Sequence, residues 1–434
     1  MKVRSVVFYR KACGVLGLKV CGAMFAFFLQ AMLARKLGVE QYGVYSYLLS
    51  WVAIMAITSS FGFEHVNSKN VAVLKVKNKN ERLVVLVFTS YICVLFVSLV
   101  CLALLTLFSN KLINVDVYKS AFLACLFLIP LQAFIHVNIG ILRGFKSQML
   151  SVLLSDVGRP VLGCFLVYLI FQLFNDFSAA TAIRLMACAS LVVLSVGFYS
   201  VYRYVKRIWV QPPWLKVFGS VIVWGKYAIP FVLYTGVTQV ERNIDILMLG
   251  RLDSLESVGI FSVVSRITTL ILLINVALGT VASPIFSELK ATNKLNELQL
   301  YIKYVVVATT VIAIIIAGIC LKFGETILLF FGEEYIAGYA TLKIICIAQV
   351  VKAVAGPVLV LSVATGRQNV LLMFSVVTLV VHALLNLVLI PIYGSIGCAY
   401  AILISILVLS FGMAAHYHYK DGLNTTILSV FLKK

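Results

Sequence analysis

The chain has 434 residues, of which 62% are hydrophobic and 12% charged, and its mean hydropathy is +1.05. Soluble globular chains carry about 25% charged residues, so this composition excludes a soluble protein and predicts a polytopic membrane protein. The net charge of +20 does not point to nucleic acid, because the cations are spread over short segments between apolar runs, as orientation signals are.

Twelve apolar runs follow one another along the chain. Each is about as long as a membrane-spanning helix requires, roughly 20 residues, and none shows the ten-residue alternation of a barrel strand. We therefore expect an all-α integral membrane fold with twelve transmembrane helices. The runs cover residues 13–34, 42–63, 83–108, 117–142, 150–174, 179–202, 220–250, 257–285, 299–322, 337–364, 370–391 and 395–417.

The lysines and arginines between these runs indicate the orientation in the membrane. If the N-terminus is cytoplasmic, the inside segments carry 21 cations and the outside segments carry 6. Cytoplasmic loops are enriched in Lys and Arg, so we expect both termini in the cytoplasm. That orientation requires an even number of spans.

A repeat links the two halves of the chain. The stretch MLARKLGVEQYGVYS (32–46) aligns without a gap with MLGRLDSLESVGIFS (248–262), at an offset of 216 residues and with six identities. A basic segment with Pro212-Pro213 separates six runs from six, which predicts two domains, 1–208 and 209–434. Because six is even, both halves face the same way. This predicts two six-helix bundles in a parallel repeat, an arrangement that typically places a transport pathway in a central cavity.

Several charged residues lie inside the predicted spans. Arg184, Lys226 and Lys303 lie near span ends, where a long side chain reaches the interface. Six cations lie deeper, and each would cost roughly 2.5–3.5 kcal/mol if it faced lipid at mid-depth. We therefore expect most of them to face water or a bound anion. These candidate substrate-binding residues are Lys19, Arg159, Arg242, Arg266, Lys343 and Lys352.

Three anions accompany them: Asp156, Glu241 and Asp245. Asp156 with Arg159, and Arg242 with Asp245, are three residues apart and so share a helix face. Each pair is either a structural ion pair or part of a transport site. The remaining surplus of cations favours an anionic substrate such as a phosphate or pyrophosphate.

Other chemistry is not indicated. The sequence has no GxxxxGK[ST] motif for ATP, no HExxH or GxSxG motif, and no CxxC pair among its ten cysteines. We expect no enzyme activity, no metal site and no cofactor, so that H⁺ or Na⁺ is the candidate coupling ion, with the three anions as its candidate sites. His136 and His382 also lie within spans, where a structural hydrogen bond is the commoner role.

Four stretches resemble the bacterial polysaccharide-transporter family: LARKLGVEQYGVYSYLLSW, VERNIDILMLGRLDSLESVGIFSVVSRI, FFGEEYIAGYATLKII and LLNLVLIPIYGSIGCAYAILIS. The chain is most similar to O-antigen (Wzx-type) flippases of the multidrug/oligosaccharidyl-lipid/polysaccharide exporter superfamily. The resemblance implies a flippase of the inner membrane that moves glycan repeat units on undecaprenyl pyrophosphate to the periplasmic leaflet by alternating access. It also implies assembly partners such as a polymerase and a chain-length regulator.

The resemblance assigns cavity cations to the spans that contain Lys19, Arg242, Arg266 and Lys352, and an acidic place in span seven to Asp245. Two alternatives remain. A cation-coupled multidrug exporter of the same superfamily would be expected to have an acidic or aromatic cavity, whereas this one is basic. A membrane glycan polymerase would need longer outside loops than this sequence provides.

Overall fold

The computed structural model describes residues 2–112, 115–173, 177–211 and 214–427, and every regular element in these ranges is a helix. Nine helical stretches of the described residues are long and apolar enough to cross a membrane. The twelve predicted runs lie on helical segments, with short turns at 60–62 and 355–357; residue 174 lies outside the described residues. The all-α membrane fold is therefore confirmed.

The chain divides into two compact units, Met1–Asn243 and Ile244–Lys434. The division lies within one long helix, α8 (Trp214–Leu252). The domain boundary expected at 208/209 stays a prediction, and Pro212-Pro213 beside it lie outside the described residues.

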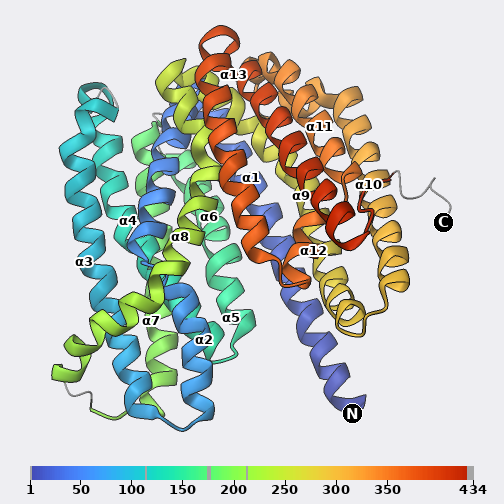
Figure 1. The fold of residues 1–434 in the computed structure, drawn as a ribbon. Coiled ribbons are helices and arrows are strands. Elements are labelled where there is room, and N and C mark those ends of the chain that lie inside the picture. The colour runs from blue at the N-terminus through green and yellow to red at the C-terminus, as the bar shows by residue number, and fades with distance from the viewer. Residues whose placement is uncertain (1, 113–114, 174–176, 212–213, 428–434) are drawn as a thin grey trace. The chain divides into compact units, whose positions relative to one another are not determined.

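Unit 1 is built from eight helical elements and the first part of α8. They are α1 (Lys2–Ser59), α2 (Phe63–Val76), α3 (Asn80–Leu112), α4 (Val115–Gly144), α5 (Gln148–Val152), the π-helix η1 (Leu153–Val157), α6 (Gly158–Leu173) and α7 (Ala179–Lys206). Helix α4 packs against α1, α2, α3 and α7, and Figure 1 shows α2, α3 and α4 side by side. Fully buried residues from α2, α3 and α4, among them Phe63, Leu86 and Leu142, form the apolar core.

The first copy of the sequence repeat contains a break in α1. Gly38 has φ 71° and ψ 173°, so α1 is two helices joined at this residue, as the first two predicted runs require. In the second copy, the equivalent position is Ser254, which lies between the end of α8 and the start of α9 (Leu255–Ala291). Ser254 is the N-cap of α9, and its side chain accepts a hydrogen bond from the N–H of Ser257. Both halves therefore interrupt the helix at the same place in the repeat, once with glycine and once with a serine N-cap.

Unit 2 continues from the end of α8 and α9. Its other elements are α10 (Leu295–Leu329), the 3₁₀ helix η2 (Glu333–Gly338), α11 (Tyr339–Val354), α12 (Val358–Ala364) and α13 (Gln368–Asp421). Helix α11 packs against α9, α10 and α13. Phe286 of α9, Ile302 of α10 and Tyr417 of α13 lie in one buried cluster.

A charged network joins the ends of α9 and α13 in unit 2. The carboxylate of Asp421 lies 2.6 Å from Nη2 of Arg367 and 3.3 Å from Nζ of Lys290. The Arg367 guanidinium also lies over the Tyr417 ring, 5.3 Å from its centroid. Because Asp421 is largely buried, these contacts compensate its desolvation and fix the last turn of α13.

Helix α13 has its own break at Gly394, which has φ 56° and ψ −131°. A side chain is disfavoured there for two reasons. The backbone conformation is one that L-residues rarely adopt, and a Cβ would lie 2.7 Å from Oδ2 of Asp253. The glycine thus allows the two halves of α13 to meet close to the loop between α8 and α9.

We predict that Gly394→Ala lowers the stability of the protein by about 1–3 kcal/mol through this strain. Gly318→Ala in α10 is the matched control, because no atom lies within 4 Å of the Cβ that it would add and alanine is the better helix former by roughly 0.5–1 kcal/mol. Thermal unfolding in one detergent measures both. An equal or higher melting temperature for Gly394→Ala would contradict the prediction.

Candidate functional site

The predicted site residues divide between the two units. Lys19, Asp156, Arg159, Glu241 and Arg242 belong to unit 1, whereas Asp245, Arg266, Lys343 and Lys352 belong to unit 2. The central cavity that would unite them stays a prediction, so each unit's charges are described separately.

In unit 1, a π-helix positions Asp156. Pro160 has no N–H, so it donates no helical hydrogen bond to the carbonyl of Asp156 four residues earlier. Just before it, the N–H of Gly158 bonds to the carbonyl of Leu153, five residues back, which is the π-helical pattern. Such π-bulges occur frequently at functional sites. The widened turn places the Asp156 carbonyl against Gly22 of α1.

Side chains around this π-helix form a small polar group. Asp156 accepts a hydrogen bond of 2.9 Å from the hydroxyl of Ser155. Arg159 is half-buried and interacts electrostatically with Asp156 and Tyr45, so the structure keeps the predicted neighbours together. Lys19 lies on α1, three residues before Gly22, and its side chain is exposed.

A second charged cluster in unit 1 joins His136, for which the sequence favoured a structural hydrogen bond, to Glu64 and Arg143, which the sequence did not mark as site residues. Glu64, in the first turn of α2, accepts from two side chains of α4: Oε2 lies 2.9 Å from Nδ1 of His136, and Oε1 lies 2.7 Å from Nη1 of Arg143. The Glu64 side chain is 14% exposed and its partners are each 32% exposed. His136 is therefore hydrogen-bonded to a carboxylate while still accessible.

A pattern in the sequence marks this cluster in retrospect. His136, Gly140 and Arg143 are spaced by four and three residues and so share one face of α4. A Cβ on Gly140 would collide with the backbone of Glu64, which means that the glycine lets α2 approach this face. The sequence does not show that α2 packs on α4, and it is this packing that brings Glu64 to the face with His136 and Arg143.

Helix α8 carries Glu241, Arg242 and Asp245. Asp245 is buried, and its Oδ1 lies 2.8 Å from Nε2 of His382 and accepts a 2.9 Å hydrogen bond from Nδ2 of Asn386. Helical spacing left two roles open for Asp245, an ion pair with Arg242 or a place in a transport site; its carboxylate contacts α13, and a place in a transport site stays a prediction. Arg242 is exposed and Glu241 is half-buried.

The remaining cations of unit 2 lie on α9 and α11, which pack together. Arg266 on α9 is exposed, and Lys352 on α11 is half-buried. Lys343 is exposed one turn after α11 begins, with its Nζ 4.5 Å from the centroid of the Tyr339 ring. An aromatic face stabilises a cation without neutralising it, so the charge of Lys343 can still attract an anion.

Two family models match the chain. Residues 9–290 match the family described as "Polysaccharide biosynthesis protein", and residues 230–388 match the MatE family. No curated protein matched the chain.

Solved structures of similar fold cover nearly the whole chain. An inward-facing multidrug resistance MATE family transporter of the MOP superfamily is 15% identical, with a TM-score of 0.73 over 92% of this chain and 96% of its own. The lipid II flippase MurJ, in an inward closed conformation, is 15% identical, with a TM-score of 0.74 over 95% and 90%. A MOP superfamily transporter from Pyrococcus furiosus, whose binding pocket has reversed polarity, is 14% identical, with a TM-score of 0.58 over 94% and 95%.

These matches show the fold. It is similar to that of a MATE transporter and of MurJ, in agreement with the predicted all-α membrane fold. These solved structures of similar fold are a transporter and a flippase rather than enzymes.

We predict that Gly22→Ala lowers the stability of the protein by about 1–3 kcal/mol through overpacking. The added Cβ would lie 2.5 Å from the carbonyl oxygen of Asp156 and would push α1 away from the π-helix. Gly17→Ala on the same helix is the control, since nothing lies within 4 Å of the Cβ that it would add. Melting temperatures in detergent should fall for the first variant and stay level or rise for the second; the reverse order would refute the close contact.

Proposed function

Because the chain belongs to the polysaccharide biosynthesis protein family, we propose that it is a flippase for undecaprenyl-pyrophosphate-linked O-antigen or similar surface-polysaccharide repeat units. It moves them from the cytoplasmic to the periplasmic leaflet of the bacterial inner membrane by alternating access. Both termini are cytoplasmic, and a polymerase and a chain-length regulator act next on the flipped units.

One observation carries this proposal: the spans hold exposed cations that no carboxylate neutralises. Among the residues that the structure describes, Lys19, Arg242, Arg266 and Lys343 form no ion pair. Each such charge is unfavourable against hydrocarbon by about 2.5–3.5 kcal/mol. A membrane protein with these four charges can be stable if the charges face water or an anion.

A pyrophosphate supplies the anion that such a surface lacks. Guanidinium groups bind phosphate oxygens in a bidentate fashion, and lysine binds them as a point charge. Each unit contributes one lysine and one arginine of this set, so each has groups suited to a phosphate. Lys352 and the half-buried Arg159 are the further candidate contacts in this proposal.

A cation-coupled multidrug exporter is the second candidate, favoured by the match of residues 230–388 to the MatE family. The charge of the spans favours the flippase, because a surplus of cations repels a cationic drug. Drug-efflux assays on cells that express the chain separate the two functions.

We further propose that protonation of the Asp245–His382 pair couples transport to the proton gradient. The carboxylate is buried and meets an imidazole nitrogen and an amide donor. These are suitable partners for a group that gains and loses a proton, whereas a Na⁺ site would present several oxygen ligands. Asp156 and Glu241 remain secondary candidates for the coupling ion.

We predict that Arg242→Ala or Arg266→Ala reduces surface polysaccharide at least tenfold, because removing a charge-assisted contact of about 1.5–3 kcal/mol weakens cargo binding by one to two orders of magnitude. Immunoblots of surface polysaccharide, normalised to the amount of membrane-inserted protein, measure the effect. Arg184→Ala, at a span end, is the charge-matched control. Normal display by every one of the cation variants, including Lys19→Ala and Lys352→Ala, would overturn the proposal.

We predict that Asp245→Asn abolishes the stimulation of transport by an imposed pH gradient in proteoliposomes, because the amide cannot take up a proton at this position. Asp253 is an exposed acid directly after the last residue of α8. The control variant Asp253→Asn should transport like the wild type. Stimulation of the wild type by a Na⁺ gradient but not by a pH gradient would contradict proton coupling while leaving the proposed cargo untouched.

A further inference from the structure

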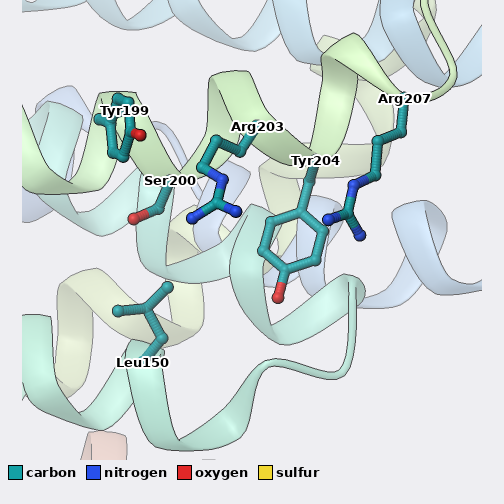
Figure 2. A pocket seen from close by; sticks show the side chains of 6 residues that line it. All are labelled: Leu150, Tyr199, Ser200, Arg203, Tyr204 and Arg207. Atoms are coloured by element: carbon teal, nitrogen blue, oxygen red, sulfur yellow. The ribbon is translucent and has the colours of Figure 1, made fainter.

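A basic pocket lies at the end of α7 in unit 1. It has a volume of about 200 Å³ and is lined by Leu150, Tyr199, Ser200, Arg203, Tyr204 and Arg207. Figure 2 shows the Arg203 and Arg207 side chains extending from the helix to the same side, with the Tyr204 ring between them and Leu150 facing them from α5. The lining therefore combines two cations, three hydroxyls and one apolar residue, with no acid.

The two guanidinium groups are like charges on one helix surface. Arg203 and Arg207 are four residues apart, which makes them neighbours on the helix surface, where like charges are mutually destabilising. Among the residues that the structure describes, neither forms an ion pair with a carboxylate. The helix dipole favours cations in this last turn, but it does not explain why two converge on a cavity.

The neighbouring residues hold this geometry in place. The Tyr204 ring stacks on Phe145, with centroids 5.0 Å apart and an interplanar angle of 15°. The Nζ of Lys75 also lies over the Phe145 ring, 5.1 Å from its centroid. Tyr204 is thus fixed between the two arginines, and a third cation reinforces the positive potential behind it.

The surroundings of the pocket are those of a membrane interface. Tyr202, Trp209 and Trp214 are each more than half exposed, and exposed Tyr and Trp gather at the level of lipid headgroups. Beside Leu150, the side chains of Met149 and Leu153 are also exposed. An apolar path therefore leads away from the arginines along α5 and η1, where an acyl chain can lie.

We propose that this pocket binds the headgroup phosphate of an anionic phospholipid. The phosphate oxygens accept from the Arg203 and Arg207 guanidinium groups, whose planar donors suit bidentate contact with phosphate, and from the hydroxyl of Tyr204. The acyl chains follow Leu150 and Leu153. Basic pockets between membrane helices recognise lipid headgroups in this way. The lipid fixes the end of α7 against α5, and this role is independent of the cargo that the protein carries.

The test uses the full chain in zwitterionic detergent, with dioleoylphosphatidylglycerol or dioleoylphosphatidylcholine added, and counts retained lipids by native mass spectrometry. We predict that the wild type retains phosphatidylglycerol in preference to phosphatidylcholine. The double variant Arg203→Ala/Arg207→Ala should bind phosphatidylglycerol roughly thirtyfold more weakly, since each basic side chain near an anionic lipid contributes about fivefold.

Lys206→Ala is the matched control, because this cation lies on the same turn of α7 but contacts the ring of Tyr202, 5.8 Å away, and does not line the pocket. It should keep wild-type retention, and the double variant should elute as the same species as the wild type. Unchanged retention in the double variant, or an equal loss in Lys206→Ala, would overturn the proposal.

Two competition experiments test the source of the phosphate. Millimolar inorganic phosphate should fail to displace the phospholipid, because it cannot use the apolar path. Displacement by inorganic phosphate would assign the pocket to a soluble anion. Displacement by an equimolar amount of undecaprenyl pyrophosphate would assign it to the cargo. Either result would refute the assignment to a phospholipid, and neither would alter the test of Arg242 and Arg266.

Discussion

A charge inside the hydrocarbon of a membrane must have either water or a partner, and the organisation of this protein follows from that constraint. The same rule applies to the backbone, whose polar groups are satisfied in a membrane by helices. It applies next to the acids: buried Asp245 meets His382 and Asn386, and Glu64 meets His136 and Arg143. The exposed cations Lys19, Arg242 and Arg266 have no such compensation within the described residues. For that reason they are the natural places for an external anion to bind.

The helices depart from regular geometry where residues lack a donor or a side chain. Pro160 lacks an N–H, and the chain forms a π-helix that turns the Asp156 carbonyl toward Gly22. Gly38 and Gly394 have positive φ and allow α1 and α13 to break. At the π-helix and at Gly394 the local conformation brings a polar group close to a specific neighbour, the Asp156 carbonyl to Gly22 and Asp253 to Gly394. Irregular backbone in membrane helices is tolerated where packing compensates for it, so these positions are sensitive to any added side chain.

The two carboxylate–histidine pairs differ in their histidines rather than in their acids. The side chains of Glu64 and Asp245 are 14% and 13% exposed, whereas that of His136 is 32% exposed and that of His382, on α13, is 9% exposed. The proposed coupling role of Asp245 rests on the burial of its pair with His382. The lipid pocket on α7 adds a third kind of polar site, in which the membrane itself provides the missing charge.

The sequence by itself determined the class of this protein and the order of its parts. Apolar runs, the distribution of lysine and arginine, and the repeat at 32–46 and 248–262 are local or periodic signals, so they predicted the helices without knowledge of packing. Only the tertiary structure decided which charges are paired. Arg242 and Asp245 are one turn apart on α8, and spacing alone allowed an ion pair; Asp245 instead contacts His382 on α13, far along the chain. Glu64 and Arg143 are likewise brought together from distant segments through the contact at Gly140. Helical periodicity specifies which residues share a face, but the neighbour of that face depends on how the helices pack, and that information is spread over the whole chain.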